Sequence, residues 1–422
     1  MTAGMSQTRK CRMPVGLRGR LLGAMAVVAV WSTGFVGAIP SAVAADVQTK
    51  QWYLSPMRAK EMWKVATGEG IKVAVIDSGV NPSTPSLKGQ VLKGLDATGV
   101  EGDEHDDYDG HGTTMAELIA GTGKGGGLQG LAPGAKIIPF RVTDTEFQNK
   151  HSVNANDAED AIRAAADSDA RVINVSMGSD FPGRGERKAV EYAQSKGKLI
   201  FAAAGNNAGE GNKEQFPASY PQVVGVAATD RNGKVSTYSQ HGGSVDIAAP
   251  GDGIPTWCNA KFQSYCDSSG GTSQATAITS AAAALIWSAH PDWTANQVLN
   301  VLFDTAGRGD WKKGTLSNYL GHGIIRPAVN ILKGKGDPGD PDISPLTKER
   351  TSGSPASSAS ASSQPGKGET DEKAGDTAMA GSTADAEKKD DNSRLGLILG
   401  GAAAVVVLGG GAFVLVRRRR AV

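Results

Sequence analysis

The chain has 422 residues, and its 44 Lys and Arg residues nearly balance 43 Asp and Glu residues, which gives a formal net charge of +1. This balance argues against a protein that coats nucleic acid, so we expect no nucleic-acid partner. The 56 glycines follow no fixed period, which argues against collagen and solenoid repeats.

The N-terminal segment has the pattern of a secretory signal peptide. Five basic residues and no acidic residue lie in the first 20 positions, ahead of an apolar stretch over 21–39. Ala42-Val43-Ala44 is a typical cleavage site. We therefore expect residues 1–45 to be a signal peptide that is removed. An uncleaved anchor is the alternative, because the apolar stretch is longer than in many signals.

Residues 46–336 alternate between strand-like and helical patterns. The predicted strands cover 71–76, 135–142, 171–175, 199–204 and 223–227, and the predicted helices cover 113–120, 158–166, 187–195 and 275–288. This alternation predicts an α/β domain with a mainly parallel sheet and helices on both faces. In such sheets, ligands bind at the carboxyl ends of the strands.

Four polar residues stand at element boundaries in this domain. Asp77 ends the first predicted strand, His111 precedes a helix, and Ser273 precedes the long apolar helix. A serine hydroxyl is a weak nucleophile, but a histidine can take its proton while a carboxylate orients the imidazole. Asn206 follows the strand over 199–204, and its amide can donate a hydrogen bond to an oxyanion. This pattern is typical of nucleophilic hydrolysis.

The sequence also carries a set of family motifs. The strings VAVIDSGV, DGHGTTMA, INVSMGS, AAAGNN and GGTSQATA resemble those of the subtilisin-like (S8) serine proteases, and the chain order Asp, His, Ser is the order of that family. The resemblance implies a subtilisin-like three-layer fold and a serine endopeptidase that needs no cofactor or catalytic metal. It makes Asp77 the orienting acid, His111 the general base and Ser273 the nucleophile.

The same resemblance assigns further residues. It makes Asn206 the oxyanion donor, implies that Ser176, Met177 and Gly178 pair with an extended substrate peptide, and implies a cis peptide bond at Phe216-Pro217.

Two positions depart from the family pattern. Thr114-Met115-Ala116-Glu117 stands where many members have a second His or Val-Ala-Gly, and Gln274 stands where many have Met or Phe. Neither change touches an atom of the triad, so we expect altered packing or specificity. The acidic run over 101–107 allows a Ca²⁺ site, but it lacks the EF-hand pattern, which favours a solvated loop.

The cysteines indicate an oxidising compartment. Cys11 lies in the predicted signal peptide, which leaves Cys258 and Cys266, eight residues apart. An even pair in an extracytoplasmic domain predicts one disulfide.

The C-terminal part has the composition of a tether and an anchor. Residues 337–394 contain no aromatic side chain and predict a disordered linker. Residues 395–416 carry no charge over a length that spans a bilayer, which predicts a transmembrane helix. The basic tail over 417–422 then lies in the cytoplasm and the catalytic domain outside the cell membrane. A sortase signal is the alternative, but no LPxTG-like pentapeptide precedes this segment.

This layout resembles the mycosins, the membrane-anchored proteases of actinobacterial type VII secretion systems. The resemblance implies three partners, namely a peptide or protein substrate, the membrane and a type VII secretion complex. A scaffold in such a complex, with proteolysis secondary, is the alternative function.

Overall fold

The computed structural model describes residues 44–142, 158–267 and 270–351. The chain divides into two compact units, Met1–Ser357 and Ser358–Val422, and the second lies entirely outside the described residues. The predicted transmembrane segment and most of the predicted signal peptide lie outside them too. No helix of the described part is long and apolar enough to cross a membrane.

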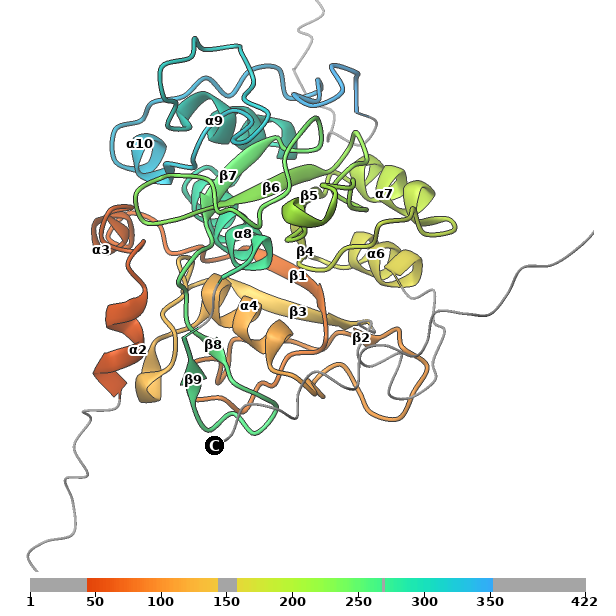
Figure 1. The fold of residues 1–422 in the computed structure, drawn as a ribbon, viewed down its shortest axis with the longest axis vertical. Coiled ribbons are helices and arrows are strands. Elements are labelled where there is room, and N and C mark those ends of the chain that lie inside the picture. Colours follow the sequence, from red (N-terminus) through yellow and green to blue (C-terminus); the bar gives the residue numbers. More distant parts are fainter. Residues whose placement is uncertain (1–43, 143–157, 268–269, 352–422) are drawn as a thin grey trace, which may run out of the picture. The chain divides into compact units, whose positions relative to one another are not determined.

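A parallel sheet forms the centre of the described residues (Figure 1). Its seven strands there have the order β2-β3-β1-β4-β5-β6-β7, and every neighbouring pair is parallel. The strands are β1 (Lys72–Asp77), β2 (Leu95–Asp96), β3 (Lys136–Arg141), β4 (Val172–Val175), β5 (Leu199–Ala203), β6 (Val224–Thr229) and β7 (Ile247–Pro250). β3 and β4 lie on opposite sides of β1, so the strand order reverses at β1. Folds of this kind bind ligands at the carboxyl ends of the strands where the order reverses, which here is the end of β1.

Helices cover both faces of the sheet. Helices α4 (His111–Ala120) and α8 (Thr272–Ala289) cover one face, and α6 (Ala158–Asp167) and α7 (Glu186–Ser195) cover the other. Because strand residues alternate between faces, Val73 and Val75 of β1 pack toward α4 and α8, whereas Ala74 and Ile76 pack toward α6 and α7. Three layers result, as the sequence predicts.

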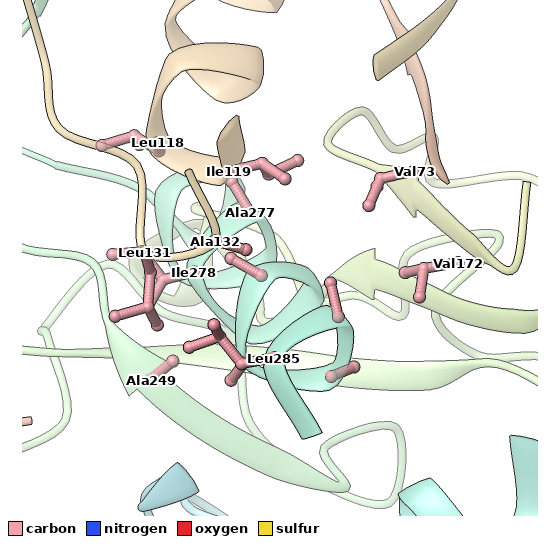
Figure 2. Close-up of a cluster of buried hydrophobic side chains, with 14 of the residues drawn as sticks. Val73, Leu118, Ile119, Leu131, Ala132, Val172, Ala249, Ala277, Ile278 and Leu285 are labelled. Atoms are coloured by element: carbon pink, nitrogen blue, oxygen red, sulfur yellow. The ribbon is translucent and has the colours of Figure 1, made fainter. Parts of the chain in front are cut away.

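Helix α8 is buried along nearly its whole length. It is rich in alanine and packs against both the sheet and α4. Figure 2 shows Ile278 and Leu285 of α8 in one apolar cluster with Leu118 and Ile119 of α4. A helix that is apolar all round belongs in a core. Ser273 is therefore held at the end of a fixed element.

Smaller elements surround these layers. They are α2 (Ala44–Lys50), α3 (Ala59–Met62), η1 (Lys124–Gly126), η2 (Ala208–Glu210), α9 (Ala295–Thr305), α10 (Pro327–Ile331) and a hairpin of β8 (Thr256–Trp257) and β9 (Tyr265–Cys266). The predicted disulfide joins Cys258 to Cys266 across this hairpin.

The linker begins later than the sequence predicts. The prediction places it from residue 337, but residues 337–351 lie against α9. The side chains of Asn296 and Asn300 donate hydrogen bonds to the carbonyls of Pro341 and Pro338, at 2.9 and 3.0 Å. Leu346 packs on the core cluster. Residues 352–394 of the predicted linker lie outside the described residues.

Candidate active site

Asp77 and His111 meet at the carboxyl end of β1. Oδ1 of Asp77 lies 2.7 Å from Nδ1 of His111, and the Asp77 side chain is only 1% exposed. In the neutral ring, an Nδ1 that donates its hydrogen to Asp77 leaves Nε2 free to act as a base. Gly112 permits this approach, since a Cβ there would collide with the carbonyl of Gly79.

Two further carboxylates hold the first turn of α4. Asp107 is buried and accepts hydrogen bonds from the backbone N–H of Gly110 and Thr113, at 2.9 and 2.8 Å. Asp109 accepts one from the backbone N–H of His111, at 2.6 Å. The expectation of a solvated loop is therefore wrong for Asp107, because this carboxylate caps the helix that carries His111.

The surrounding carboxylates set the charge of His111. Burial lowers the pKa of the imidazole, but the charge of Asp77, the hydrogen bond to it and the charges of Asp109 and Asp107 outweigh burial and raise that pKa to about 9. Burial and the charge of Asp107 in turn raise the pKa of Asp109. The imidazolium is thus well stabilised beside this acidic cluster.

Ser273 lies in the first turn of α8, beside the end of β4, the strand next to β1 in the sheet. Its side chain is 7% exposed, and its Oγ donates to the carbonyl of Ser176 at 2.9 Å. In the part of the chain that the structure describes, this hydroxyl makes no hydrogen bond to His111. Ser176 directly follows β4, and Val175 of β4 pairs with Ile76 of β1. The Asp77–His111 pair therefore lies at the end of β1, and Ser273 lies at the end of the adjacent strand β4.

Asn206 is anchored to the residue before Ser273. Its Oδ1 accepts from the backbone N–H and from the hydroxyl of Thr272, at 2.8 and 2.9 Å. Within the described residues its Nδ2 makes no hydrogen bond, and the side chain is exposed. A free amide N–H next to the start of α8 suits an oxyanion donor.

The segment Ser176–Gly178 extends β4 beyond the sheet. Among the described residues it belongs to no strand pairing, and the next residue, Ser179, forms a two-way backbone bridge with Phe216. The Phe216-Pro217 peptide bond is cis, as the family resemblance implies. A segment that follows a strand without its own pairing can accept a peptide strand alongside it.

Comparison with known proteins identifies the family. The profile of the Subtilase family, Peptidase_S8, matches residues 68–323. The chain belongs to the subtilase family. Thermitase of Thermoactinomyces vulgaris is 35% identical over 280 residues, which are 64% of this chain and 95% of thermitase. This subtilase is therefore a serine protease by family.

Two solved structures of mycosins resemble this subtilase. MycP1 from Mycobacterium smegmatis has a TM-score of 0.59 and 28% identity, over 71% of this chain and 88% of that chain. The MycP3 protease from the type VII (ESX-3) secretion system has a TM-score of 0.55 and 32% identity, over 66% and 87%. Both support the likeness to mycosins that the sequence suggests.

The carboxylates that support His111 were not predicted from the sequence. Asp107 lies four residues and Asp109 two residues before His111, close enough to cap the first turn of its helix. Each binds backbone N–H groups within six residues of itself, so these contacts are local in the sequence. Among the described residues, no group of three or more His, Cys, Asp or Glu side chains has the arrangement of a metal site.

Proposed function

We propose that this subtilase is a membrane-anchored, extracytoplasmic serine endopeptidase in which Asp77, His111 and Ser273 form the catalytic triad. One observation carries the proposal. A 2.7 Å hydrogen bond orients His111 on Asp77 at the end of β1, and the Ser273 hydroxyl lies at the adjoining end of β4, where it is bonded to Ser176.

These positions support the following reaction. The Ser273 hydroxyl rotates from the Ser176 carbonyl to Nε2 of His111, gives its proton to that nitrogen, and Oγ forms a bond with the peptide carbonyl carbon. The imidazolium, stabilised by Asp77, passes the proton to the leaving amine as the C–N bond breaks. Water then gives a proton to Nε2 and its oxygen attacks the ester. That proton returns to Oγ when the acid product leaves.

Two other groups support the transition state. Nδ2 of Asn206 and the backbone N–H of Ser273 donate to the oxygen that becomes negatively charged. The substrate lies along Ser176–Gly178 as an added strand, which brings its carbonyl group to Ser273.

Covalent labelling tests this assignment. A fluorophosphonate probe should label the wild-type chain, and Ser273→Ala should abolish labelling while circular dichroism shows an unchanged fold. Ser288→Ala, near the other end of α8, is the control and should label normally. Persistent labelling of Ser273→Ala would contradict the triad.

The membrane and secretion roles rest on different support. The uncharged segment 395–416 supports an anchor, and the likeness to MycP1 and MycP3 supports an association with type VII secretion. Deletion of residues 395–422 should release the protein from the membrane fraction. If export fails on deletion of the whole gene but continues with Ser273→Ala, the scaffold function outweighs proteolysis.

A further inference from the structure

Glu117 is a buried carboxylate in the middle of α4, six residues after His111. Its side chain has no solvent exposure. Burial raises its pKa to about 7, although the hydrogen bonds from the hydroxyls of Tyr265 and Thr84 oppose this rise. A buried carboxylate costs stability when it ionises. The reaction proposed above does not use it, so its place in this helix needs another explanation.

The Glu117 carboxylate joins three segments. Oε2 accepts from the hydroxyl of Tyr265 in β9 at 2.6 Å, and Oε1 accepts from the hydroxyl of Thr84 at 2.8 Å. The Tyr265 oxygen also accepts from the backbone N–H of Leu128, at 3.3 Å. Hydrogen bonds to a charged acceptor are stronger than neutral ones, so these contacts fix Tyr265 relative to α4.

Tyr265 passes this restraint to the hairpin. Its ring stacks on Trp257 with 3.8 Å between ring centroids. The Cys258–Cys266 disulfide closes the hairpin next to both aromatic residues. Trp257 Nε1 makes no hydrogen bond within the described residues, so the Trp257 ring is tied to Glu117 through its stacking on Tyr265. The stacking and the Tyr265 hydrogen bond therefore connect both rings to Glu117.

The hairpin contacts the backbone that leads into His111. The backbone N–H of Trp257 donates to Oγ1 of Thr114 at 3.1 Å, and this hydroxyl donates to the carbonyl of Gly110 at 2.6 Å. Trp257 also covers Gly110, since a Cβ at Gly110 would lie 2.8 Å from Cβ of Trp257. Gly110 directly precedes His111, so a shift of the hairpin moves the attachment point of the imidazole.

We propose that Glu117 is a positioning residue for His111, which it holds in place through Tyr265, Trp257 and Thr114. Glu117, Tyr265 and Thr84 form a clamp between the hairpin and the first turns of α4. The inference rests on the proposed function, because it takes His111 to be the general base. An error of about 1 Å in such a group costs a large factor in rate.

The test compares variants that break or keep these hydrogen bonds. Glu117→Met and Tyr265→Phe break the clamp. They should lower kcat for a peptide substrate about tenfold and change KM less than twofold. Glu117→Gln keeps an acceptor for Tyr265 and a donor for the rotatable Thr84 hydroxyl, so it should retain kcat near the wild-type value. All variants are made in the full chain.

A second buried pair controls for lost stability. Tyr220 donates to Glu186 at 3.0 Å, and both side chains are buried. Tyr220→Phe should lower the melting temperature about as much as Tyr265→Phe but leave kcat unchanged.

The outcomes separate the inference from the proposed function. If Glu117→Met and Tyr265→Phe lose stability but keep kcat, or raise KM alone, Glu117 does not position His111. An equal loss of kcat in Glu117→Gln would also overturn the hydrogen-bonded clamp. If the wild-type chain itself does not react with a fluorophosphonate, the proposed function fails instead.

Discussion

At the scale of single residues, the carboxylates around His111 determine its protonation. In the proposed reaction the base must be neutral to take the proton of Ser273, so kcat/KM should rise with pH toward the raised pKa of His111, at about 9. The charge of Asp109 contributes to the raised pKa of His111. The loop before α4 therefore sets the pH range of activity.

Asp109→Asn should shift this pH dependence. The neutral amide keeps an acceptor for the His111 N–H but removes a charge that stabilises the imidazolium, so the pKa of His111 falls. The acid limb of the kcat/KM profile should move to lower pH. Asp103→Asn, farther along the same loop, is the control. An unchanged profile in Asp109→Asn would show that its charge does not act on the base.

Asn206→Ala should slow turnover without weakening substrate binding. Loss of an oxyanion donor costs about 10²–10³-fold in kcat, a magnitude that comes from a subtilisin and so from a relative of this chain. Steady-state kinetics should show this fall in kcat with a nearly constant KM, and the neighbouring Asn207→Ala should behave as wild type. A rise in KM at normal kcat would instead assign Asn206 to substrate binding.

The sequence predicts residue identities better than residue contacts. Asp77, His111 and Ser273 stand out because each lies at the boundary of a strongly patterned element. The bond of Ser273 to Ser176 does not, because it joins residues that are 97 apart in the sequence. The contacts of Asp107 are local, but a run of acidic residues does not show which of its carboxylates turns inward to bind the helix.

At the scale of elements, the buried Glu117 couples α4 to pH. Its folded-state pKa, about 7, is above the ordinary value of 4.5, so the unfolded chain releases this proton first. This group therefore makes wild-type stability fall as pH rises from about 4.5 to about 7 and adds no further change above that.

Glu117→Gln should remove this component. The difference between the free energies of unfolding of Glu117→Gln and wild type should therefore grow in favour of the variant from pH 5 to pH 8. The pKa shift sets the size of this change at about 2–3 kcal/mol. Urea denaturation at the two pH values measures it, with the exposed Glu69→Gln as control. An equal pH response in Glu117→Gln and wild type would show that Glu117 does not titrate as described.

Elements with continuous apolar patterns were predictable, and short ones were not. β1 and α8 follow from runs of buried residues. β7 has only four residues and ends in proline, so it lacked a strand pattern. α9 carries a capping box of Thr294 and Gln297, a sequence signal that would have marked its start.

At the scale of the whole molecule, the catalytic domain extends beyond the predicted boundary. Residues 337–351 have few apolar side chains, so composition predicts a linker. The side chains of Asn296 and Asn300 of α9 donate hydrogen bonds to backbone carbonyls of this segment, and Leu346 adds an apolar contact. Composition does not reveal hydrogen bonds to backbone carbonyls.

A chain that ends at Thr351 should be more stable than one that ends at Gly336. Each lost hydrogen bond is worth about 1 kcal/mol, so the shorter chain should lose on the order of 2–3 kcal/mol. Thermal melting of both, in a Ser273→Ala background that prevents self-digestion, measures the difference. Equal melting temperatures would mean that residues 337–351 do not stabilise the domain.

We propose that Asp77, His111 and Ser273, which lie at adjacent strand ends, form one hydrolytic site. A crystal structure of the fluorophosphonate-treated protein tests it most directly. We predict phosphorus bonded to Oγ of Ser273, Nε2 of His111 within about 3 Å of that oxygen, and Nδ2 of Asn206 donating to the phosphonyl oxygen. Phosphorus on another residue, or His111 and Asn206 turned away from a modified Ser273, would contradict the account.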